Sequence, residues 1–393
     1  MKTEFDSLII GAGLVGLTTA LACAESGADV AILDQRKIAT GRDGRASALS
    51  STSLRLLINL GVDILDDVQP IHNMLVTEGG PTSPWRLQFG ETAKDTDLGG
   101  IIENTLLKSA LIKKVKASSK ITPFAPIHVQ DFTETEKDVR IETDQGTLTS
   151  RLLIAADGRE SLIRRKSAIT VQRFDYDSAS LVTTISHALP HDGLAWQRII
   201  KGGALAVLPL TGQRSQIVWS GPTSAIAAAQ ALSDSHFLDL LSEKMEGYLG
   251  EMKLLTLRQS YPLRLQVADK FSQGRTALVG DAAHIIHPLA GQGLNLGFRD
   301  AAALAEGIKI ARDTGQDIGV TSLLDYDLWR NTDTRALGVL THLMSQGSSV
   351  QGPIGHARRL GISLINRSSA IKSMIETRAA GGGQIVPDLM NKD

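Results

Sequence analysis

Three glycines near the start of the chain, Gly11, Gly13 and Gly16, have the spacing of a nucleotide-binding turn. In a strand–turn–helix unit, the first permits a tight turn, the second lets the backbone approach a pyrophosphate, and the third lets helix and strand pack closely. The helix N-terminus offers unpaired N–H groups to the phosphates. Asp34 ends the next expected strand, where a carboxylate can bind a ribose. This favours the ADP part of FAD or NAD over NADP; a structural glycine loop is the alternative.

Two further segments end an expected strand in an acid. Residues 152–164 (LLIAADGRESLIR) place Asp157 and Gly158 after an apolar run, which taken alone is more typical of an ordinary turn. Residues 277–300 (ALVGDAAHIIHPLAGQGLNLGFRD) place Gly280 and Asp281 in the same way. The Asp281 carboxylate could accept hydrogen bonds from a polyol chain.

A glycine-rich loop follows Asp281 and opens directly into an expected helix. Pro288, Gly291, Gln292 and Gly293 form this loop. The helix N-terminus would place positive potential beside an electron-rich ring, which stabilises a reduced, anionic isoalloxazine. A loop that serves packing only is the alternative.

The two histidines of this region, His284 and His287, are three residues apart and could suggest a metal pair. No third ligand lies nearby in the sequence, so we interpret them as packing residues and expect no metal. The sequence shows no motif typical of a Ser-His-Asp triad and no pair of carboxylates typical of acid–base catalysis. The residue types alone therefore leave the catalytic residues unassigned.

The composition excludes several classes of protein. The 393 residues suffice for two to three domains, and a net charge of −1 argues against a nucleic-acid surface. A single cysteine, Cys23, cannot form an internal disulfide and favours a reducing, cytoplasmic setting. An apolar run at residues 7–24 imitates a secretory signal, but Glu4 and Asp6 stand where positive charge is needed. We expect no membrane-spanning segment.

Hydrophobic periodicity predicts the elements that position these residues. Residues 72–100 look irregular, and 170–265 look strand-like with one helix inside 224–247. The other expected strands lie at 5–10, 29–33, 127–130, 139–142 and 147–155. Helices are expected at 14–26 and 104–116, and a long helix follows the glycine-rich loop and ends at about residue 312. The nucleotide-binding segments are thus discontinuous, with a β-rich unit inserted between them.

Together, three segments resemble the group A FAD-dependent aromatic monooxygenases: GAGLVG near residue 11, AADGRESLIR near 157, and GDAAHIIHPLAGQGLNLGFRDAAALAE near 281. RASALSSTSLRLLINLG, YPLRLQVADKF and the unbroken HPLAGQGLNLGFRDAAALAE are similar to the ubiquinone-biosynthesis ring hydroxylases of that group. The resemblance runs from residue 5 to about 380.

The resemblance implies an α/β (α+β) fold. It consists of a Rossmann-like FAD-binding domain of the glutathione-reductase-2 or para-hydroxybenzoate-hydroxylase type, an inserted β-rich substrate domain, and a helical C-terminus. We expect the FAD-binding domain at 1–71, 101–169 and 266–312, the substrate domain at 72–100 and 170–265, and the helical region at 313–393.

The resemblance also implies a set of cofactor contacts. Asp34 would bind the adenosine ribose and Asp281 the ribityl chain, while Arg45, in a mobile segment, and Pro288 would lie near the reactive ring. Thr105 departs from the family, which commonly has Arg after Asn104, so one contact is lost or supplied elsewhere. The expected FAD contacts are Gly11, Gly13, Gly16, Asp34, Arg45, Asn104, Asp157, Gly158, Gly280, Asp281, Pro288, Gly291, Gln292, Gly293, Leu294 and Asn295.

The implied activity is hydroxylation of a polyprenylated phenolic ring on the route to ubiquinone. Reduced flavin would react with O₂ at C4a, and the hydroperoxide would transfer oxygen to the ring. NAD(P)H, bound in passing near Asp157 and Gly158, or an external reductase would supply the electrons. A hydroxylase of a soluble aromatic acid and a non-catalytic flavin-binding subunit of a biosynthetic complex are the alternatives.

Residues 357–378 predict a basic amphipathic helix, with Leu360, Leu364, Ile371 and Ile375 on one stripe. Such a helix can lie on an anionic membrane surface, here the inner face, and would suit a substrate with a prenyl tail. The alternative is a helix that packs on the flavin domain or in a homo-oligomer interface.

Overall fold

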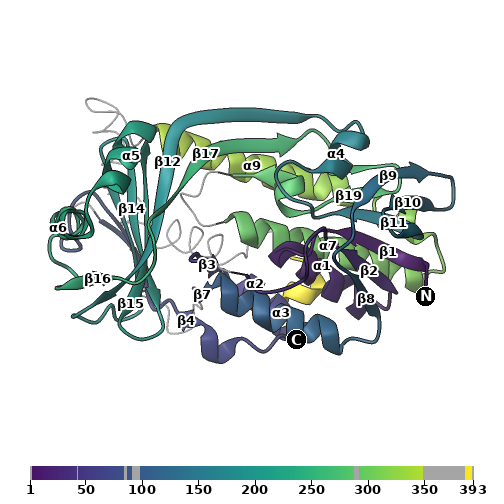
Figure 1. Ribbon diagram of the computed structural model, residues 1–393, viewed down its shortest axis with the longest axis horizontal. Helices are drawn as coiled ribbons and strands as arrows, with labels where there is room; N and C mark the ends of the chain where they lie inside the picture. Colours follow the sequence, from purple (N-terminus) through teal and green to yellow (C-terminus); the bar gives the residue numbers. More distant parts are fainter. Residues whose placement is uncertain are drawn as a thin grey trace.

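The computed structural model describes residues 2–41, 43–83, 86–90, 98–286, 292–347 and 386–391. Its strands form an eight-stranded sheet, a nine-stranded sheet and a small three-stranded sheet. The two large sheets stand at opposite ends of the molecule, and helices accompany both (Figure 1).

The eight-stranded sheet has a parallel centre with the order β19-β11-β1-β2-β8. Strands β2 and β19 and the C-terminal halves of β1 and β11 consist mostly of buried aliphatic residues, as expected for a parallel sheet covered on both faces. The order brings the carboxyl ends of β1, β2 and β11 together. The central strands are β1 (Glu4–Ile10), β2 (Val30–Leu33), β8 (Ile121–Phe124), β11 (Gly146–Ala155) and β19 (Thr276–Leu278), with β18 (Ser272–Gln273) at the edge.

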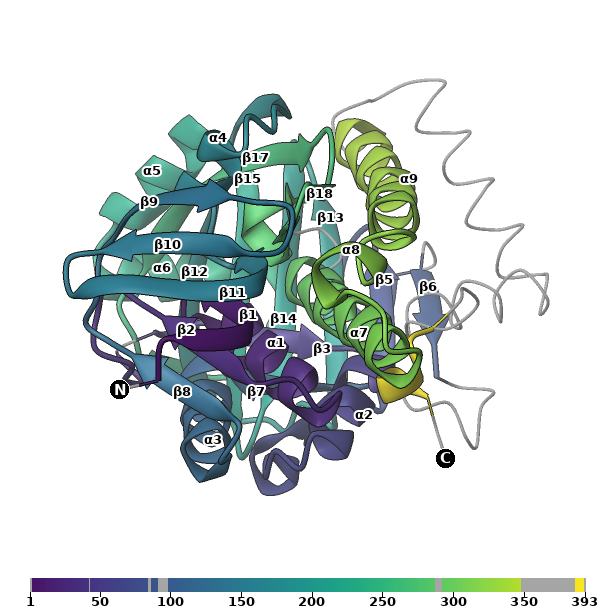
Figure 2. The ribbon, with the colours of Figure 1, turned by 90° about the vertical axis from the view of Figure 1, so that its right-hand side faces the viewer.

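Three helices pack together beside this sheet: α1 (Leu14–Glu25), α3 (Asn104–Ala117) and α7 (Gly293–Asp313). Strands β9 (Val129–Glu134) and β10 (Val139–Thr143) form an antiparallel meander with the first half of β11. Figure 2 shows this meander and α7 on opposite sides of the parallel strands.

The nine-stranded sheet has the order β20-β17-β12-β15-β14-β13-β5-β6, with β16 paired to β12. Its neighbours are antiparallel except that β5 runs parallel to β13. Helices α5 (Thr223–Ala231) and α6 (Asp234–Lys244) share a core with one face. The strands are β5 (Asn73–Thr77), β6 (Arg86–Phe89), β12 (Val171–His187), β13 (Leu194–Ile200), β14 (Gly203–Leu210), β15 (Arg214–Pro222), β16 (Met252–Leu254), β17 (Gln259–Ala268) and β20 (His284–Ile285).

A three-stranded sheet and α2 (Ser51–Asn59) lie between the large sheets (Figure 1). The small sheet consists of β3 (Ala46–Leu49), β4 (Gln69–Pro70) and β7 (Gly100–Glu103). A separate apolar cluster joins it to the nine-stranded sheet, with Ile101 of β7 buried against Ala195 of β13 and Leu210 of β14.

The C-terminal part continues with α8 (Ile318–Thr321) and α9 (Tyr326–Gly347), and a short 3₁₀ turn at Asp388–Met390 contacts α2 and α7. The amphipathic helix expected at 357–378 lies outside the described residues. Among the described helices, none is long and apolar enough to cross a bilayer.

Several expected elements need correction. The irregular stretch at 72–100 contains β5 and β6, β8 had no counterpart in the prediction, and the strand expected at 127–130 runs from Val129 to Glu134. The single helix expected in 224–247 is two, because the Ser233 side chain accepts a hydrogen bond from the His236 N–H and so starts a new helix.

Candidate functional site

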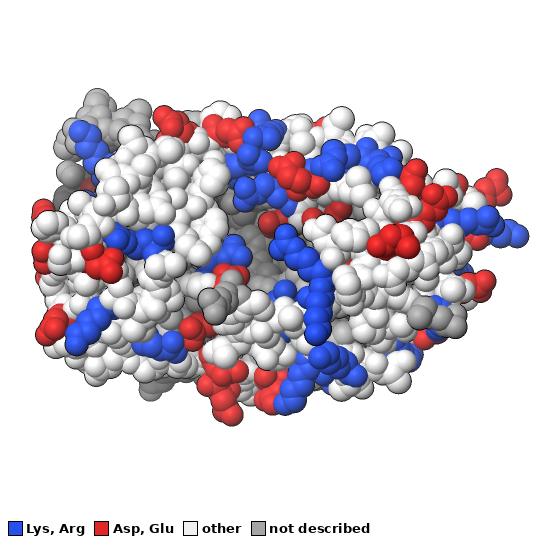
Figure 3. All heavy atoms as spheres, in the orientation of Figure 1, with Lys and Arg blue, Asp and Glu red and all other residues white. Residues whose placement is uncertain are grey.

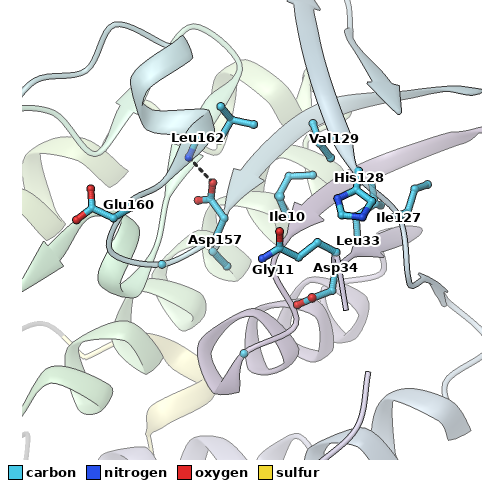
Figure 4. Close-up of a pocket in the computed structure, with 14 residues that line it drawn as sticks. Ile10, Gly11, Leu33, Asp34, Ile127, His128, Val129, Asp157, Glu160 and Leu162 are labelled. Carbon is cyan, nitrogen blue, oxygen red and sulfur yellow. Dashed lines mark hydrogen bonds between the residues drawn. The ribbon is translucent and has the colours of Figure 1, made fainter. Parts of the chain in front are cut away.

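A pocket of about 420 Å³ opens at the carboxyl ends of the central parallel strands (Figure 4). Turns after β1, β2 and β11 supply most of its lining, and the segment between β8 and β9 completes it. Ligands of open parallel sheets bind at this edge. The lining residues are Ile10, Gly11, Gly13, Leu33, Asp34, Gln35, Ile127, His128, Val129, Ala156, Asp157, Gly158, Glu160 and Leu162.

The three fingerprint glycines occupy distinct environments. Gly11 has φ of +106°, and a Cβ there would lie 2.3 Å from the Ala156 carbonyl oxygen. A Cβ on Gly16 would lie 1.9 Å from the Gly11 carbonyl oxygen, so α1 can pack this closely only with glycine. Gly13, the N-cap of α1, would direct a Cβ into open space, with no neighbouring atom of the described residues within 4 Å. Packing within the protein therefore does not require glycine at position 13. A ligand that lies against the backbone there would require it.

Asp34 lies at the end of β2, on the pocket edge. Its Oδ2 accepts a hydrogen bond from the Ala12 N–H at 2.7 Å, and its Oδ1 accepts one from the Arg36 N–H at 2.8 Å. A carboxylate offers about four acceptor positions, so capacity for ribose hydroxyls remains. The carboxylate thus both fixes the glycine turn and faces the pocket.

Asp157 lies across the pocket from Asp34 in Figure 4. Its Oδ2 accepts hydrogen bonds from Leu162 N–H at 2.7 Å and Ile163 N–H at 3.3 Å, at the start of α4 (Leu162–Lys166). Its Oδ1 is buried without a partner in the part of the chain that the structure describes. A Cβ on Gly158, which has φ of +84°, would meet open space. A buried acceptor without a donor beside open space fits a bound polar ligand.

A second group of polar residues surrounds Asp281, which follows β19 within a short 3₁₀ turn. Its side chain is accessible, yet protein encloses it enough that desolvation raises the pKa of its carboxyl. The charges of His284, Arg159 and Arg45 act in the opposite direction on that pKa. Asp281 therefore shares a recess with two arginines. Figure 3 shows the surface hollowed between the two large sheets, with Lys and Arg side chains around the hollow.

Arg45 is held by several partners at this recess. Its Nε and Nη2 each donate to one oxygen of Asp43 at 2.8 Å, and its guanidinium lies 5.4 Å from the Tyr261 ring centre. The hydrogen bond to Asp43 raises the pKa of Arg45, desolvation opposes this, and the Asp281 charge adds a further upward contribution. Asn104 donates from Nδ2 to Asp43 Oδ2 at 3.2 Å and accepts at Oδ1 from the Ser47 hydroxyl at 2.7 Å. Its amide thus supports the segment that carries Arg45.

Helix α7 begins at Gly293, and no side chain caps its first N–H groups within the described residues. A Cβ on Gly293 would meet open space. Asn295 is buried and ties this turn to the small sheet: Oδ1 accepts from Ser50 N–H at 2.9 Å and Nδ2 donates to Ala48 O at 2.8 Å. Leu294 packs on the main core, and Gln292 is half-buried. Pro288 and Gly291 lie outside the described residues.

A buried charge network lies beneath the Gly280–Asp281 turn. Asp300 of α7 is fully buried, 2.6 Å from His284 Nε2 and 2.8 Å from Arg330 Nε of α9. Asp333 joins the network through Arg330 at 2.5 Å and Arg299 at 2.9 Å. His284 is thus a buried, hydrogen-bonded residue of this network, and His287 lies outside the described residues. The described residues contain no cluster of three or more His, Cys, Asp or Glu side chains suited to a metal.

Several site residues were missed by sequence reasoning. His128 and Val129 enter the pocket from the β8–β9 connection, Arg159 faces Asp281, and Tyr261 of β17 stacks on Arg45. His128 and Val129 belong to none of the motifs. Arg159 and Tyr261 lie in the segments AADGRESLIR and YPLRLQVADKF, but the sequence analysis assigned neither residue a role. The turn at Asp157 was the one available signal for Arg159, two residues further on.

A family model described as an FAD binding domain matches residues 4–326. The chain belongs to that family. Relatives include the ubiquinone hydroxylase UbiL of Rhodospirillum rubrum, 35% identical over 98% of this chain and 91% of the relative. The 3-demethoxyubiquinol 3-hydroxylase of Escherichia coli is 29% identical over 95% of this chain and 97% of its own. These matches confirm the family predicted from the sequence, that of FAD-dependent monooxygenases which include ubiquinone hydroxylases.

Solved structures confirm the predicted fold. The p-nitrophenol 4-monooxygenase PnpA of Pseudomonas putida superposes with a TM-score of 0.80 at 20% identity, covering 98% of this chain and all of the other. PqsL of Pseudomonas aeruginosa, a probable FAD-dependent monooxygenase, has a TM-score of 0.77 at 21% identity, covering 93% of this chain and 100% of the other.

Proposed function

We propose that FAD extends from the pocket between Asp34 and Asp157 to the recess at Asp281. The observation that carries this proposal is the pocket itself. Among the described residues, no neighbouring atom would restrict a side chain at position 13, and Oδ1 of Asp157 is buried without a hydrogen-bond partner. The pyrophosphate would lie at Gly13 and the N-terminus of α1, the ribose at Asp34, and the ribityl chain at Asp281. The ring would lie near Arg45 and the start of α7.

Asp281→Ala should then weaken FAD binding tenfold to a hundredfold, because losing a charged acceptor costs about 1.5–3 kcal/mol. The stability of the apoprotein should not fall, since burial already raises the pKa of this carboxyl and disfavours its charge. Flavin fluorescence titration and urea unfolding measure the two effects. Asp313→Ala, at the exposed C-terminal end of helix α7 and outside the proposed flavin site, is the control. Unchanged FAD affinity in Asp281→Ala would contradict the placement.

We propose that the bound flavin faces a substrate cavity walled by the nine-stranded sheet. Val76, Ala206 and Val218 lie on the sheet face opposite α5 and α6, and Ala206 pairs directly with Val218 across the strands. All three are partly exposed. Gln216, two residues from Val218 on the same face, bonds to Gly44 and Ala46, so this face turns toward the flavin-binding part. Small, apolar residues suit an aromatic ring with an apolar tail.

The relatives named ubiquinone hydroxylases support hydroxylation of a polyprenylated phenol in ubiquinone biosynthesis. Bound FAD would supply the activation of O₂, which protein side chains cannot provide. The residues of this chain would bind the cofactor, orient the phenol against its ring, and exclude water from both. NAD(P)H or a separate reductase would deliver the electrons.

Oxygen consumption by the FAD-loaded protein with a reductant tests the function. We expect oxygen consumption to rise when a prenylated phenol is added, and mass spectrometry to detect the hydroxylated phenol. Small aromatic acids should neither raise oxygen consumption nor be hydroxylated. Activity on aromatic acids alone would favour the soluble-substrate alternative. No substrate-dependent consumption, with either NAD(P)H or a reductase, would favour a non-catalytic flavin-binding subunit. Quinone analysis of a deletion strain would identify the ring carbon through the intermediate that accumulates.

We further propose peripheral contact with an anionic membrane through residues 357–378, from their sequence alone. Their cations are Arg358, Arg359, Arg367, Lys372 and Arg378, against the single acid Glu376. Wild-type protein should float with anionic liposomes and less with neutral ones, and truncation after Gly355 should remove this binding. Unchanged flotation of a folded truncated protein would show that the segment packs on the protein or in an oligomer instead.

A further inference from the structure

The segment that carries Arg45 is held from two sides. From the flavin-binding part, Asn104 supports Asp43 and Ser47 through its side chain, and its N–H donates to the Arg45 carbonyl at 2.9 Å. From the nine-stranded sheet, Gln216 of β15 reaches across to the same segment. Residues 43–47 therefore form a bridge whose position depends on both sheets.

Gln216 makes a two-ended contact with this bridge. Its Oε1 accepts from the Ala46 N–H at 2.9 Å, and its Nε2 donates to the Gly44 carbonyl at 3.0 Å. Only 1% of the side chain is exposed. The two bonds fix the peptide groups on either side of Arg45. Replacing a buried amide that donates and accepts in this way leaves a buried donor and acceptor without partners, which costs free energy.

The guanidinium of Arg45 benefits from this restraint. It is about half-exposed and is held by Asp43 and the face of Tyr261 rather than by close packing. An exposed ion pair by itself restrains a side chain weakly. A fixed backbone on both sides of Arg45 therefore decides where its charge lies relative to Asp281.

We infer that Gln216 is a positioning residue of the flavin site: it acts through the backbone of residues 44–46 to keep the Arg45 charge at the recess. The inference rests on the proposed FAD function and extends it to a residue of the opposite sheet. Because Gln216 lies on the sheet face proposed to line the substrate cavity, it connects that face physically to the flavin-side cation.

A double-mutant cycle tests the inference. Gln216→Leu, similar in size but without hydrogen bonds, should raise the FAD dissociation constant about tenfold, as expected for loss of two neutral hydrogen bonds. In an Arg45→Met background the same change should have less than about twofold effect, since no charge remains to be positioned. Gln197→Leu is the matched control, because Gln197 lies on the same sheet face and has no contact with residues 43–47 among the described hydrogen bonds; its FAD affinity should stay at the wild-type value.

Gln216→Glu provides a second, conservative variant. Its protonated carboxyl can keep both bonds, whereas the ionised form must lose the bond to the Gly44 carbonyl. The ratio of its FAD dissociation constant to that of wild type should therefore fall as the pH is lowered. A purely structural role would not produce this recovery.

Two outcomes overturn the inference. Equal losses of affinity from Gln216→Leu in the wild-type and Arg45→Met backgrounds would show that Gln216 does not act through Arg45. Unchanged FAD affinity, with only a lower unfolding midpoint in urea, would show a role in stability alone. Wild-type protein that takes up no FAD would instead overturn the proposed function, and the inference with it.

Discussion

Asp300→Ala should leave little folded protein. Asp300 accepts from Gly280 N–H at 3.0 Å, from His284 Nε2 at 2.6 Å and from Arg330 Nε at 2.8 Å, all in the interior. Removing it leaves the fully buried Arg330 with Asp333 as its remaining acid partner in the network. Breaking a buried pair in this way costs about 3–5 kcal/mol, a large part of the 5–15 kcal/mol that stabilises a typical protein.

Soluble yield and urea unfolding measure this effect, with Asp313→Ala as the control. Asp313 lies on the same helix in an exposed pair with Lys309, so its loss should cost less than about 0.5 kcal/mol. Equal stabilities of the two variants would contradict the network. Desolvation raises the pKa of Asp300, but the charges of His284 and Arg330 outweigh it and bring the pKa to about 2. Because this value is below the unfolded one, the contribution is complete above about pH 4 and is lost as the pH falls toward 2.

Gly13→Asp should abolish tight FAD binding while leaving the apoprotein folded. Gly13 has φ of −74° and ψ of −178°, which any residue adopts, and in the described part of the chain a Cβ there would meet no neighbouring atom within 4 Å. Aspartate is also a good N-cap for α1. A carboxylate at this point would occupy and repel the pyrophosphate, so we expect a loss of at least about a hundredfold, or roughly 3 kcal/mol.

Gly16→Ala is the contrasting variant, since its Cβ would lie 1.9 Å from the Gly11 carbonyl oxygen and must displace α1. It should lower the unfolding midpoint of the apoprotein, which Gly13→Asp should not. Fluorescence titration with FAD and urea unfolding of both apoproteins separate the two roles. Wild-type FAD affinity in Gly13→Asp would place the pyrophosphate elsewhere.

The first strand–turn–helix–strand unit was predictable because its signals are local. Gly11, Gly13, Gly16 and Asp34 lie within one short stretch. The structure places Gly11, Gly13 and Asp34 at one pocket edge and Gly16 in the close packing of α1 on the turn. Strand β8 is harder to predict because it has four residues and includes Pro123. Proline is tolerated there because, among the described strands, β8 pairs with β2 alone, at the edge of the sheet.

Long-range partners explain what the sequence could not show. Gln216 is one polar residue in a strand, and its partners Gly44 and Ala46 are about 170 residues away in the chain. Likewise, nothing near Asp300 in the sequence indicates Arg330, which arrives on α9. The sequence analysis assigned Asp300 no role, because its burial depends on how α7, β20 and α9 pack together.

The parallel pairing of β5 with β13 has a consequence during protein synthesis. Asn73 of β5 pairs with Leu194 of β13, so β5 leaves the ribosome about 120 residues before its neighbour exists. At about 5–20 residues per second, the wait is roughly 6 to 24 s. Throughout that interval the apolar strand has an unpaired edge, which is the usual template for aggregation. The nascent chain should therefore depend on chaperones between the emergence of β5 and that of β13.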